Sequence, residues 1–217
     1  MSTETIKRRT RIKICGLRSR DDAALAINAG ADSIGLVFHA RSPRYLANGE
    51  AIAIRQSVPA FVTVTALFMD ENESEVADVV SAVKPDCLQF HGSESRPFCE
   101  QWGIPYIKAI PMGSVNDAEA YAAQYPGAQG FLMDSNAAGR QGGTGDTFDW
   151  SKIPSAFQYP LILAGGLNPR NVAEAVRQVH PYAVDVSSGV EASRGIKDAN
   201  LIRQFCNEVY GVDCQDR

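Results

Sequence analysis

Two short segments in the second half of the chain carry residues that could bind a phosphate group. Gly165 and Gly166 adjoin in the first, and Ser187, Ser188 and Gly189 follow one another in the second. Glycines allow the backbone to approach an anion closely, while hydroxyl and backbone N–H groups donate hydrogen bonds to it. Two ordinary glycine turns are the alternative. The presence of both segments, each directly after an apolar run, favours a phosphate site.

A third glycine-rich segment, GGTG at residues 142–145, includes Gly143 and Gly145. It lacks the GKS/T ending of a nucleotide-binding P-loop and therefore gives no support for ATP binding. We expect a mobile lid whose backbone amides, including those of Gly143 and Gly145, close over a phosphate. A flexible surface loop is the alternative interpretation.

The segments that must position these residues alternate between strand-like and helix-like patterns along the chain. Eight runs are rich in apolar and β-branched residues. Several of them are almost continuously apolar, which is typical of parallel strands covered on both faces. The runs span residues 11–15, 33–38, 61–68, 87–90, 106–110, 130–134, 161–164 and 183–186.

Four of the intervening helical patterns have recognisable first residues. Ser19, Ser74 and Asn200 are of residue types that cap helix N-termini, and each precedes apolar residues at helical spacing. Asn168 stands before a proline, which is favoured in the first turn of a helix. Gly30 is placed to end the first helix.

Eight strand–helix units in 217 residues predict an α/β protein, specifically a (β/α)₈ TIM barrel. No Gly/Ser/Pro-rich linker divides the chain, so we expect residues 1–217 to form a single barrel domain, with residues 1–10 as a polar N-terminal tail. A doubly wound open sheet is the competing fold. It usually carries a GxGxxG turn after the first strand, whereas this chain reads CGLR at residues 15–18.

In a barrel of this kind, functional residues follow the carboxyl ends of the strands, because only those loops converge on the open top. The residues at these positions are small, polar or reactive, whereas the strand interiors before them are mostly apolar. They include Cys15, Gly16, His39, Asp70, His91, Gly92, Asp134, Ser135, Gly165, Gly166, Ser187, Ser188 and Gly189.

The charge balance gives no indication of a polyanionic partner, because 21 Lys and Arg face 25 Asp and Glu. One basic cluster lies near the start, where a nucleic-acid patch competes with a solvated tail leading into the first strand; we favour the tail. No apolar run approaches the ~20 residues of a membrane span, and the polar start lacks the apolar core of a signal peptide. The basic cluster near the start of the chain consists of Lys7, Arg8, Arg9, Arg11 and Lys13.

The five cysteines are odd in number, widely spaced and without a CxxC pair. This pattern argues against a disulfide framework and against a zinc site. We expect no metal and no cofactor. Cys87 and Cys99 sit in apolar patterns and are interpreted as core residues. We expect a cytoplasmic protein that binds a small phosphorylated molecule, with no nucleic-acid or membrane partner, as a monomer rather than a homodimer.

Six motifs in order give a more specific indication: KICGL at 13–17, SPRY at 42–45, QFHG at 89–92, GGTGDTFDW at 142–150, AGGLNP at 164–169 and VDVSSGVE at 184–191. With these motifs, the chain closely resembles the phosphoribosylanthranilate isomerase family of tryptophan biosynthesis, from about Arg11 to the final helix. One departure is Asp146, which stands where the family usually has lysine.

The resemblance implies an Amadori rearrangement of an N-phosphoribosyl anthranilate to its 1-deoxyribulose form without a cofactor. It assigns Cys15 as the base that removes the C2′ proton and Asp134 as the acid that protonates the furanose ring oxygen. It also assigns Arg44 to the anthranilate carboxylate, whose planar shape suits a guanidinium fork. His91 either lines the pocket or makes a structural hydrogen bond.

These roles make physical demands on the two groups. A thiol, with an ordinary pKa of about 8.5, needs either a lowered pKa or a cationic intermediate beside it to act as a base near neutrality. A carboxyl group, with an ordinary pKa of about 3.9, needs a raised pKa to donate a proton. Lys13, on the same strand face as Cys15, is predicted to pair inside the barrel with Asp185.

Three other functions remain as alternatives. The sister sugar isomerase of histidine synthesis, or a bifunctional enzyme, would use an aspartate at the position of Cys15. A phosphopentose epimerase would need a metal cluster, which His39, His91 and Asp134 could imitate. A catalytically inactive phosphate-binding barrel with a regulatory role is the third.

Overall fold

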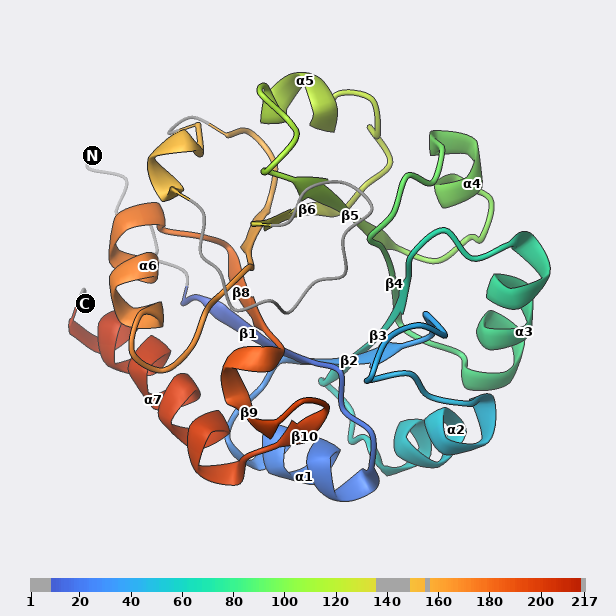
Figure 1. Ribbon diagram of the computed structural model, residues 1–217, viewed down its shortest axis with the longest axis horizontal. Helices are drawn as coiled ribbons and strands as arrows, with labels where there is room; N and C mark the ends of the chain where they lie inside the picture. Colours follow the sequence, from blue (N-terminus) through green and yellow to red (C-terminus); the bar gives the residue numbers. More distant parts are fainter. Residues whose placement is uncertain (1–8, 136–148, 155–156, 216–217) are drawn as a thin grey trace, which may run out of the picture.

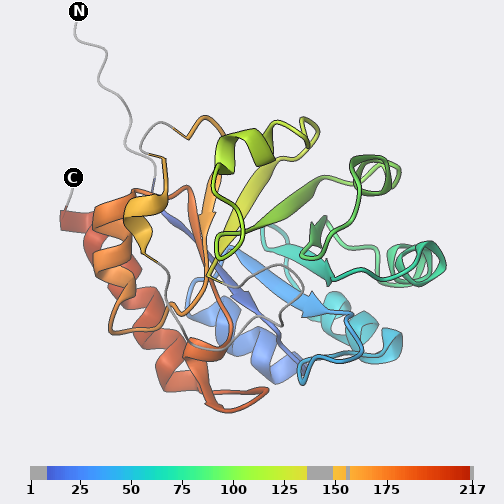
Figure 2. The same cartoon turned by 45° about the horizontal axis from the view of Figure 1, so that its top comes forward.

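The computed structural model, which describes residues 9–135, 149–154 and 157–215, contains a closed barrel of eight parallel strands with helices around it (Figures 1 and 2). Neighbouring strands follow chain order, and the first strand closes the barrel by pairing with the eighth. The strands are β1 (Arg11–Cys15), β2 (Ser33–Val37), β3 (Thr63–Phe68), β4 (Cys87–Phe90), β5 (Tyr106–Pro111), β6 (Gly130–Asp134), β7 (Leu161–Leu163) and β8 (Ala183–Val186). The predicted TIM barrel is confirmed.

The strand boundaries differ from the expected ones by no more than two residues. The largest difference is at β3, which begins at Thr63 instead of Phe61. Phe61 has a φ of 70° and a fully exposed side chain, so it belongs to the turn before the strand.

The helices that surround the barrel are α1 (Arg20–Asn28), α2 (Asn48–Ser57), α3 (Glu73–Val83), α4 (Arg96–Glu100), α5 (Ala118–Ala122), α6 (Val172–Val179) and α7 (Ala199–Gln215). Between β6 and β7, the described residues form only a short 3₁₀ helix, η1 (Trp150–Lys152). After β8, the chain forms a second 3₁₀ helix, η2 (Ser188–Val190), and a small hairpin of β9 (Glu191–Ser193) and β10 (Ile196–Lys197) that the sequence had not predicted.

The helix starts are partly as predicted. Ser19 caps α1 by accepting a hydrogen bond from the Asp22 N–H at 3.0 Å, and Gly30, with a φ of 98°, follows the end of that helix. Asn168 accepts a hydrogen bond from the next turn of chain, but α6 begins only at Val172.

Two predicted caps were wrong by two residues, for the same physical reason. Asn72 caps α3 in place of Ser74, and Asp198 caps α7 in place of Asn200. In each case an acceptor side chain two residues earlier reaches the first free N–H groups of the helix, so the helix starts two residues sooner.

The inside of the barrel is divided into an apolar and a polar half. The apolar half is a small cluster contributed by β5 to β8, with Cys87 of β4 packed against it: Ile107, Ala109, Leu132, Ile162, Ala164 and Ala183. The polar half lies toward β1 and includes buried Lys13, Thr65, Gln89 and Asp185. A larger apolar core fills the space between the strands and the helices.

Lys13 and Asp185 are direct register partners on β1 and β8, and their side chains form an ion pair of 2.9 Å. The predicted pairing of these two residues is therefore confirmed. Other members of the basic cluster are also engaged: Arg9 pairs with Asp32, and the Arg11 guanidinium lies 4.3 Å from the centre of the Tyr182 ring. Lys7 and Arg8 lie outside the described residues.

None of the helices in the described part of the chain combines the length and the apolar character needed to span a membrane. All five cysteines are free. Cys99 is fully buried, as expected of a core residue, while Cys87 is partly buried.

Candidate active site

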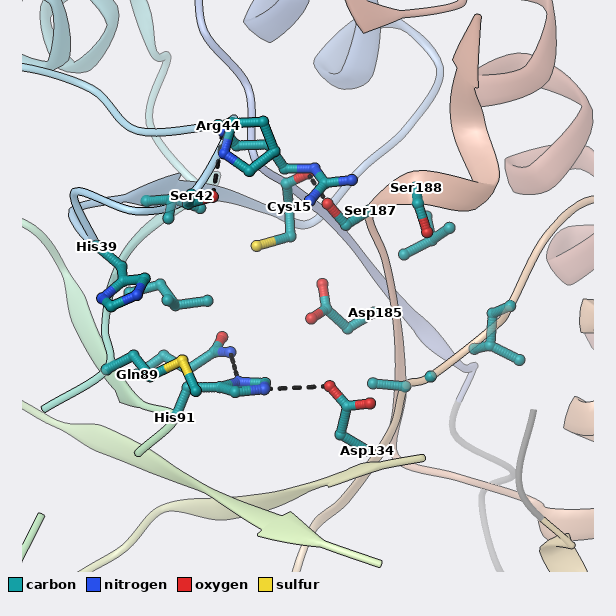
Figure 3. Close-up of a pocket in the computed structure, with 18 of the residues that line it drawn as sticks. Cys15, His39, Ser42, Arg44, Gln89, His91, Asp134, Asp185, Ser187 and Ser188 are labelled. Carbon is teal, nitrogen blue, oxygen red and sulfur yellow. Dashed lines mark hydrogen bonds and ion pairs between the residues drawn. The ribbon is translucent and has the colours of Figure 1, made fainter. Parts of the chain in front are cut away.

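A pocket opens at the carboxyl ends of the strands, where the sequence predicted the functional residues to gather. Its lining residues come from β1, β2, β3, β4, β6, β7 and β8 or from the loops that follow these strands (Figure 3). Eight of the predicted site residues line it together: Cys15, Arg44, His91, Asp134, Gly165, Gly166, Ser187 and Ser188. Gly143 and Gly145 lie outside the described residues, as does Asp146.

The Cys15 thiol is placed at the pocket by the end of β1 and by a glycine on the neighbouring strand. Cys15 pairs in register with Gly35 of β2, and a Cβ atom on Gly35 would lie 2.7 Å from the Cys15 sulfur. Gly35 therefore provides the space that the thiol occupies. The side chain is only 4% exposed, and its sulfur points into the cavity (Figure 3).

The electrostatic setting of Cys15 does not provide the first of the two conditions stated above, a lowered pKa. Burial raises the pKa of the thiol above its ordinary value, and the nearby Lys13 ammonium lowers it without overcoming that effect. The protein alone thus does not supply a lowered pKa, which leaves a cationic intermediate to favour the thiolate. Burial also opposes the charge on Lys13, but attraction to Asp185 and to Cys15 raises its pKa overall.

The carboxyl group of Asp134, at the end of β6, faces the same cavity from another wall (Figure 3). It is 6% exposed, and one of its oxygens lies 3.1 Å from Nε2 of His91. Nδ1 of His91 in turn lies 3.1 Å from Nε2 of Gln89. When Gln89 donates to Nδ1, the imidazole carries its proton on Nε2, the nitrogen nearest Asp134. His91 therefore both lines the pocket and makes a hydrogen bond.

The loops after β7 and β8 meet at glycines. Gly165 and Gly166 have φ values of 80° and 64°, a region that favours glycine. A Cβ atom on Gly189 would lie 1.9 Å from the carbonyl oxygen of Leu167, so only glycine allows the two loops to touch here. Their contact brings the Gly165 and Ser188 segments to the same side of the pocket. Gly189 supports this arrangement from outside the lining.

Arg44 lines the pocket but is already paired within the protein. Its Nε and Nη2 atoms donate to the two carboxylate oxygens of Glu191 at 2.6 and 2.9 Å. Lys197 also donates to Glu191, at 3.0 Å. Glu191 stands in one of the motifs, which assigned it no role. Lys197 carried no signal in the sequence, because its partners are known only once the hairpin after β8 is folded.

The two histidines of the pocket contact different carboxylates. His39 Nδ1 lies 2.6 Å from Glu71, whereas His91 contacts Asp134. Across the described residues, no three His, Cys, Asp or Glu side chains gather as metal ligands would. The geometry therefore gives no support for the metal-dependent epimerase alternative.

Comparison with known proteins gives a consistent result. The family model described as N-(5'phosphoribosyl)anthranilate (PRA) isomerase matches residues 12–208. The N-(5'-phosphoribosyl)anthranilate isomerase of Xanthomonas euvesicatoria pv. vesicatoria is 49% identical over 214 residues, which cover 96% of each chain.

Two solved structures share the fold over almost their whole length. One is a phosphoribosyl anthranilate isomerase in complex with reduced 1-(o-carboxyphenylamino)-1-deoxyribulose 5-phosphate, with a TM-score of 0.80 and 36% identity, covering 93% of this chain and 99% of that chain. The other is described as monomers of the dimeric enzyme from Thermotoga maritima, with a TM-score of 0.82, 35% identity and the same coverage. The chain therefore belongs to the N-(5'-phosphoribosyl)anthranilate isomerase family.

Proposed function

We propose that this chain is an intramolecular oxidoreductase that converts N-(5'-phosphoribosyl)anthranilate to 1-(o-carboxyphenylamino)-1-deoxyribulose 5-phosphate, the third step from chorismate to tryptophan. One observation carries the proposal. In a chain of this family, the Cys15 thiol and the Asp134 carboxyl group both line the same pocket. The reaction needs one acid and one base and no cofactor.

Asp134 is the proposed acid. It gives its proton to the furanose ring oxygen, the bond from C1′ to that oxygen breaks, and the amine nitrogen supplies the electrons that form a cationic Schiff base. The contact with His91 supports this role, because an imidazole N–H beside the carboxylate stabilises it after the proton has left.

Cys15 is the proposed base. It takes the C2′ proton, and the electrons of that bond neutralise the Schiff base to give an enol–amine, which then becomes the ketone product. The raised pKa of the thiol fits this order of events, because the thiolate is favoured only when the cationic Schiff base is beside it.

The two anionic ends of the substrate have separate sites in this proposal. The phosphate binds where the loops after β7 and β8 meet, with Gly165, Gly166, Ser187 and Ser188 as donors and Gly189 holding the loops together. Gly143 and Gly145 would add backbone amides over the phosphate. Arg44 binds the anthranilate carboxylate, and His91 contributes to the pocket wall.

The same proposal treats residues 1–217 as one barrel domain, working as a monomer in the cytoplasm. Five free thiols suit a reducing compartment. The large apolar side chains that are exposed in the described part of the chain lie on separate elements, as is common on monomers: Leu25, Tyr45, Phe61, Tyr182 and Ile196. Light scattering that gave twice the mass of 23.5 kDa would contradict a monomer.

A fluorescence assay of phosphoribosylanthranilate consumption tests the activity. Cys15→Ala and Asp134→Asn should each lower kcat by about 10²–10⁴-fold, because each removes a proton-transfer group. Cys206→Ala, at a buried cysteine on α7 away from the pocket, is the matched control and should keep the wild-type rate. Wild-type turnover by Cys15→Ala would refute the assigned base. Turnover of the aminoaldose of histidine synthesis instead would favour the sister isomerase.

A further inference from the structure

Behind the proposed carboxylate site lies a buried group of three charged side chains, Arg44, Glu191 and Lys197, which we name the Arg44 cluster. Glu191 accepts two hydrogen bonds from Arg44, one from Lys197 and one from the Gly195 N–H, all between 2.6 and 3.0 Å. The side chains of Arg44, Glu191 and Lys197 are 8%, 4% and 0% exposed. The carboxylate is thus saturated with donors, and its two cationic partners are held in fixed positions.

We propose that Glu191 and Lys197 are positioning residues for the anthranilate carboxylate: Glu191 orients the guanidinium of Arg44, and Lys197 neutralises Glu191 so that the positive charge of Arg44 remains for the substrate. The inference rests on the proposed function, because it takes Arg44 to be the group that meets that carboxylate. It adds two residues whose roles neither the motifs nor the comparisons assign.

The geometry of the Arg44 fork is the first support. Glu191 occupies the edge formed by Nε and Nη2, and Nη1 makes no hydrogen bond with any residue that the structure describes. A guanidinium has five N–H donors and can bind a second carboxylate through its other edge. Glu191 therefore fixes the plane of Arg44 without using all of its donors.

The charge of the cluster is the second support. An isolated Arg44–Glu191 pair would be neutral and would attract a carboxylate only weakly. Lys197 adds a second positive charge, so the cluster carries a net charge of one positive unit beside the pocket. A buried ion pair is a weak source of stability, because the cost of removing both charges from water offsets their attraction. Stability alone is therefore a poor explanation for three buried charges here.

The cluster also connects the two ends of the pocket. Lys197 donates to the Ser187 carbonyl at 2.8 Å, and the Ser187 hydroxyl donates to the Cys15 carbonyl at 3.1 Å. Lys197 thus contacts the first residue of the loop that is proposed to bind the phosphate. Loss of Lys197 should disturb both ends of the substrate, whereas loss of the Glu191 charge should disturb only the carboxylate end.

Steady-state kinetics with phosphoribosylanthranilate separates a positioning role from a structural one. Glu191→Gln leaves one oxygen for donors that now bind two, so Arg44 loses its fixed orientation, an effect that outweighs the added positive charge. Lys197→Met removes the charge that neutralises Glu191. Each variant should raise KM about tenfold and leave kcat within about twofold, because an interaction equal in ground and transition states changes KM alone. Lys197→Arg, which keeps the charge, should restore most of the affinity.

Two inhibitors locate the effect on the pocket. Glu191→Gln should weaken inhibition by anthranilate about tenfold and leave inhibition by inorganic phosphate within about twofold, whereas Lys197→Met should weaken both. In an Arg44→Ala background, Glu191→Gln should have no further effect on anthranilate, because the two residues act through one contact. If Glu191→Gln does not fold, Glu191→Asp, which withdraws the carboxylate by one methylene, should show the same selectivity.

Asp86→Asn is the matched control, because Asp86 also accepts from a guanidinium and a backbone N–H, those of Arg55 and Val64, but at the opposite end of the barrel. It should leave KM and both inhibition constants at wild-type values. Wild-type KM and anthranilate affinity in Glu191→Gln, with a lowered melting temperature alone, would overturn the inference. Wild-type protein that binds both inhibitors but does not turn over phosphoribosylanthranilate would instead refute the proposed function, and the binding measurements would still test the cluster.

Discussion

At the scale of single residues, the site combines a thiol that the protein holds in its neutral form with a carboxyl group that lies beside an imidazole. The surroundings of Cys15 disfavour the thiolate, since burial raises its pKa. Asp134, in contrast, has an imidazole beside it that can donate to the carboxylate. The free enzyme therefore keeps the Cys15 thiol protonated, and in the proposed mechanism the positive charge of the Schiff base is what favours the thiolate.

The protected state of Cys15 can be tested by alkylation with iodoacetamide and peptide mass spectrometry. Because its pKa is raised, Cys15 should react more slowly at pH 7 than the exposed Cys214, and its rate should rise as the pH passes above the ordinary thiol value of about 8.5. Burial raises the pKa of Cys87 to about 11 and of Cys99 and Cys206 to about 12, so these thiols serve as unreactive references. Faster modification of Cys15 than of Cys214 at neutral pH would mean that its pKa is lowered.

Site residues were predictable only where a strand end or a motif marked them. Cys15 and Asp134 were named because they stand at the ends of predicted strands, and Arg44 because it stands in the SPRY motif at 42–45. Their roles came from the family resemblance. Glu191 and Lys197 were missed. The partner of Glu191 is 147 residues away along the chain, and such a contact follows from barrel closure, not from local spacing.

At the scale of elements, strands were predictable because their signal is local. A parallel strand covered on both faces must be apolar over four to six residues, and such runs are visible without knowing their neighbours. Helix starts were less predictable, because several polar residues in a row can serve as the cap. Asn72 competes with Ser74, and the residue that reaches the free N–H groups is decided by the path of the preceding loop.

The contact between the loops after β7 and β8 requires a glycine at position 189. Gly189→Ala would place a methyl group 1.9 Å from the Leu167 carbonyl, so the two loops must separate. Inhibition by inorganic phosphate should weaken about tenfold or more, and the free energy of unfolding should fall by about 1–3 kcal/mol.

Gly211→Ala on α7 is the control for this substitution, because its new methyl group meets no atom within 4 Å. It should leave phosphate inhibition unchanged and raise the free energy of unfolding by about 0.4–1 kcal/mol, since alanine restricts the unfolded chain more than glycine does. Equal phosphate affinity in Gly189→Ala and Gly211→Ala would show that the contact between the loops does not shape the anion site.

At the scale of the whole molecule, closure of the barrel places charge on one side of its interior. Where β1 meets β8, the first and last strands contribute Lys13 and Asp185 as register partners, whereas β5 to β8 fill the other half with apolar side chains. The polar side is also the side on which Cys15 and the Arg44 cluster stand. The seam that closes the fold is therefore part of the floor of the pocket.

This arrangement predicts how stability responds to changes in the ion pair at the seam. Lys13→Met should lower the free energy of unfolding by about 3–5 kcal/mol, because Asp185 is left buried without its partner, and Lys13→Met/Asp185→Leu should recover most of that loss. Urea unfolding followed by circular dichroism measures both. The pKa of Lys13 is raised, so the stability that its protonation contributes should be fully present up to about pH 10.4 and be lost as the pH rises through the higher value of the folded state. A double variant no more stable than Lys13→Met would show that the cost comes from lost packing and not from the stranded charge. If the double variant is stable but has a reduced kcat, the ion pair matters for catalysis. Two apolar side chains would then close the barrel equally well, but Cys15 would have no cation near it.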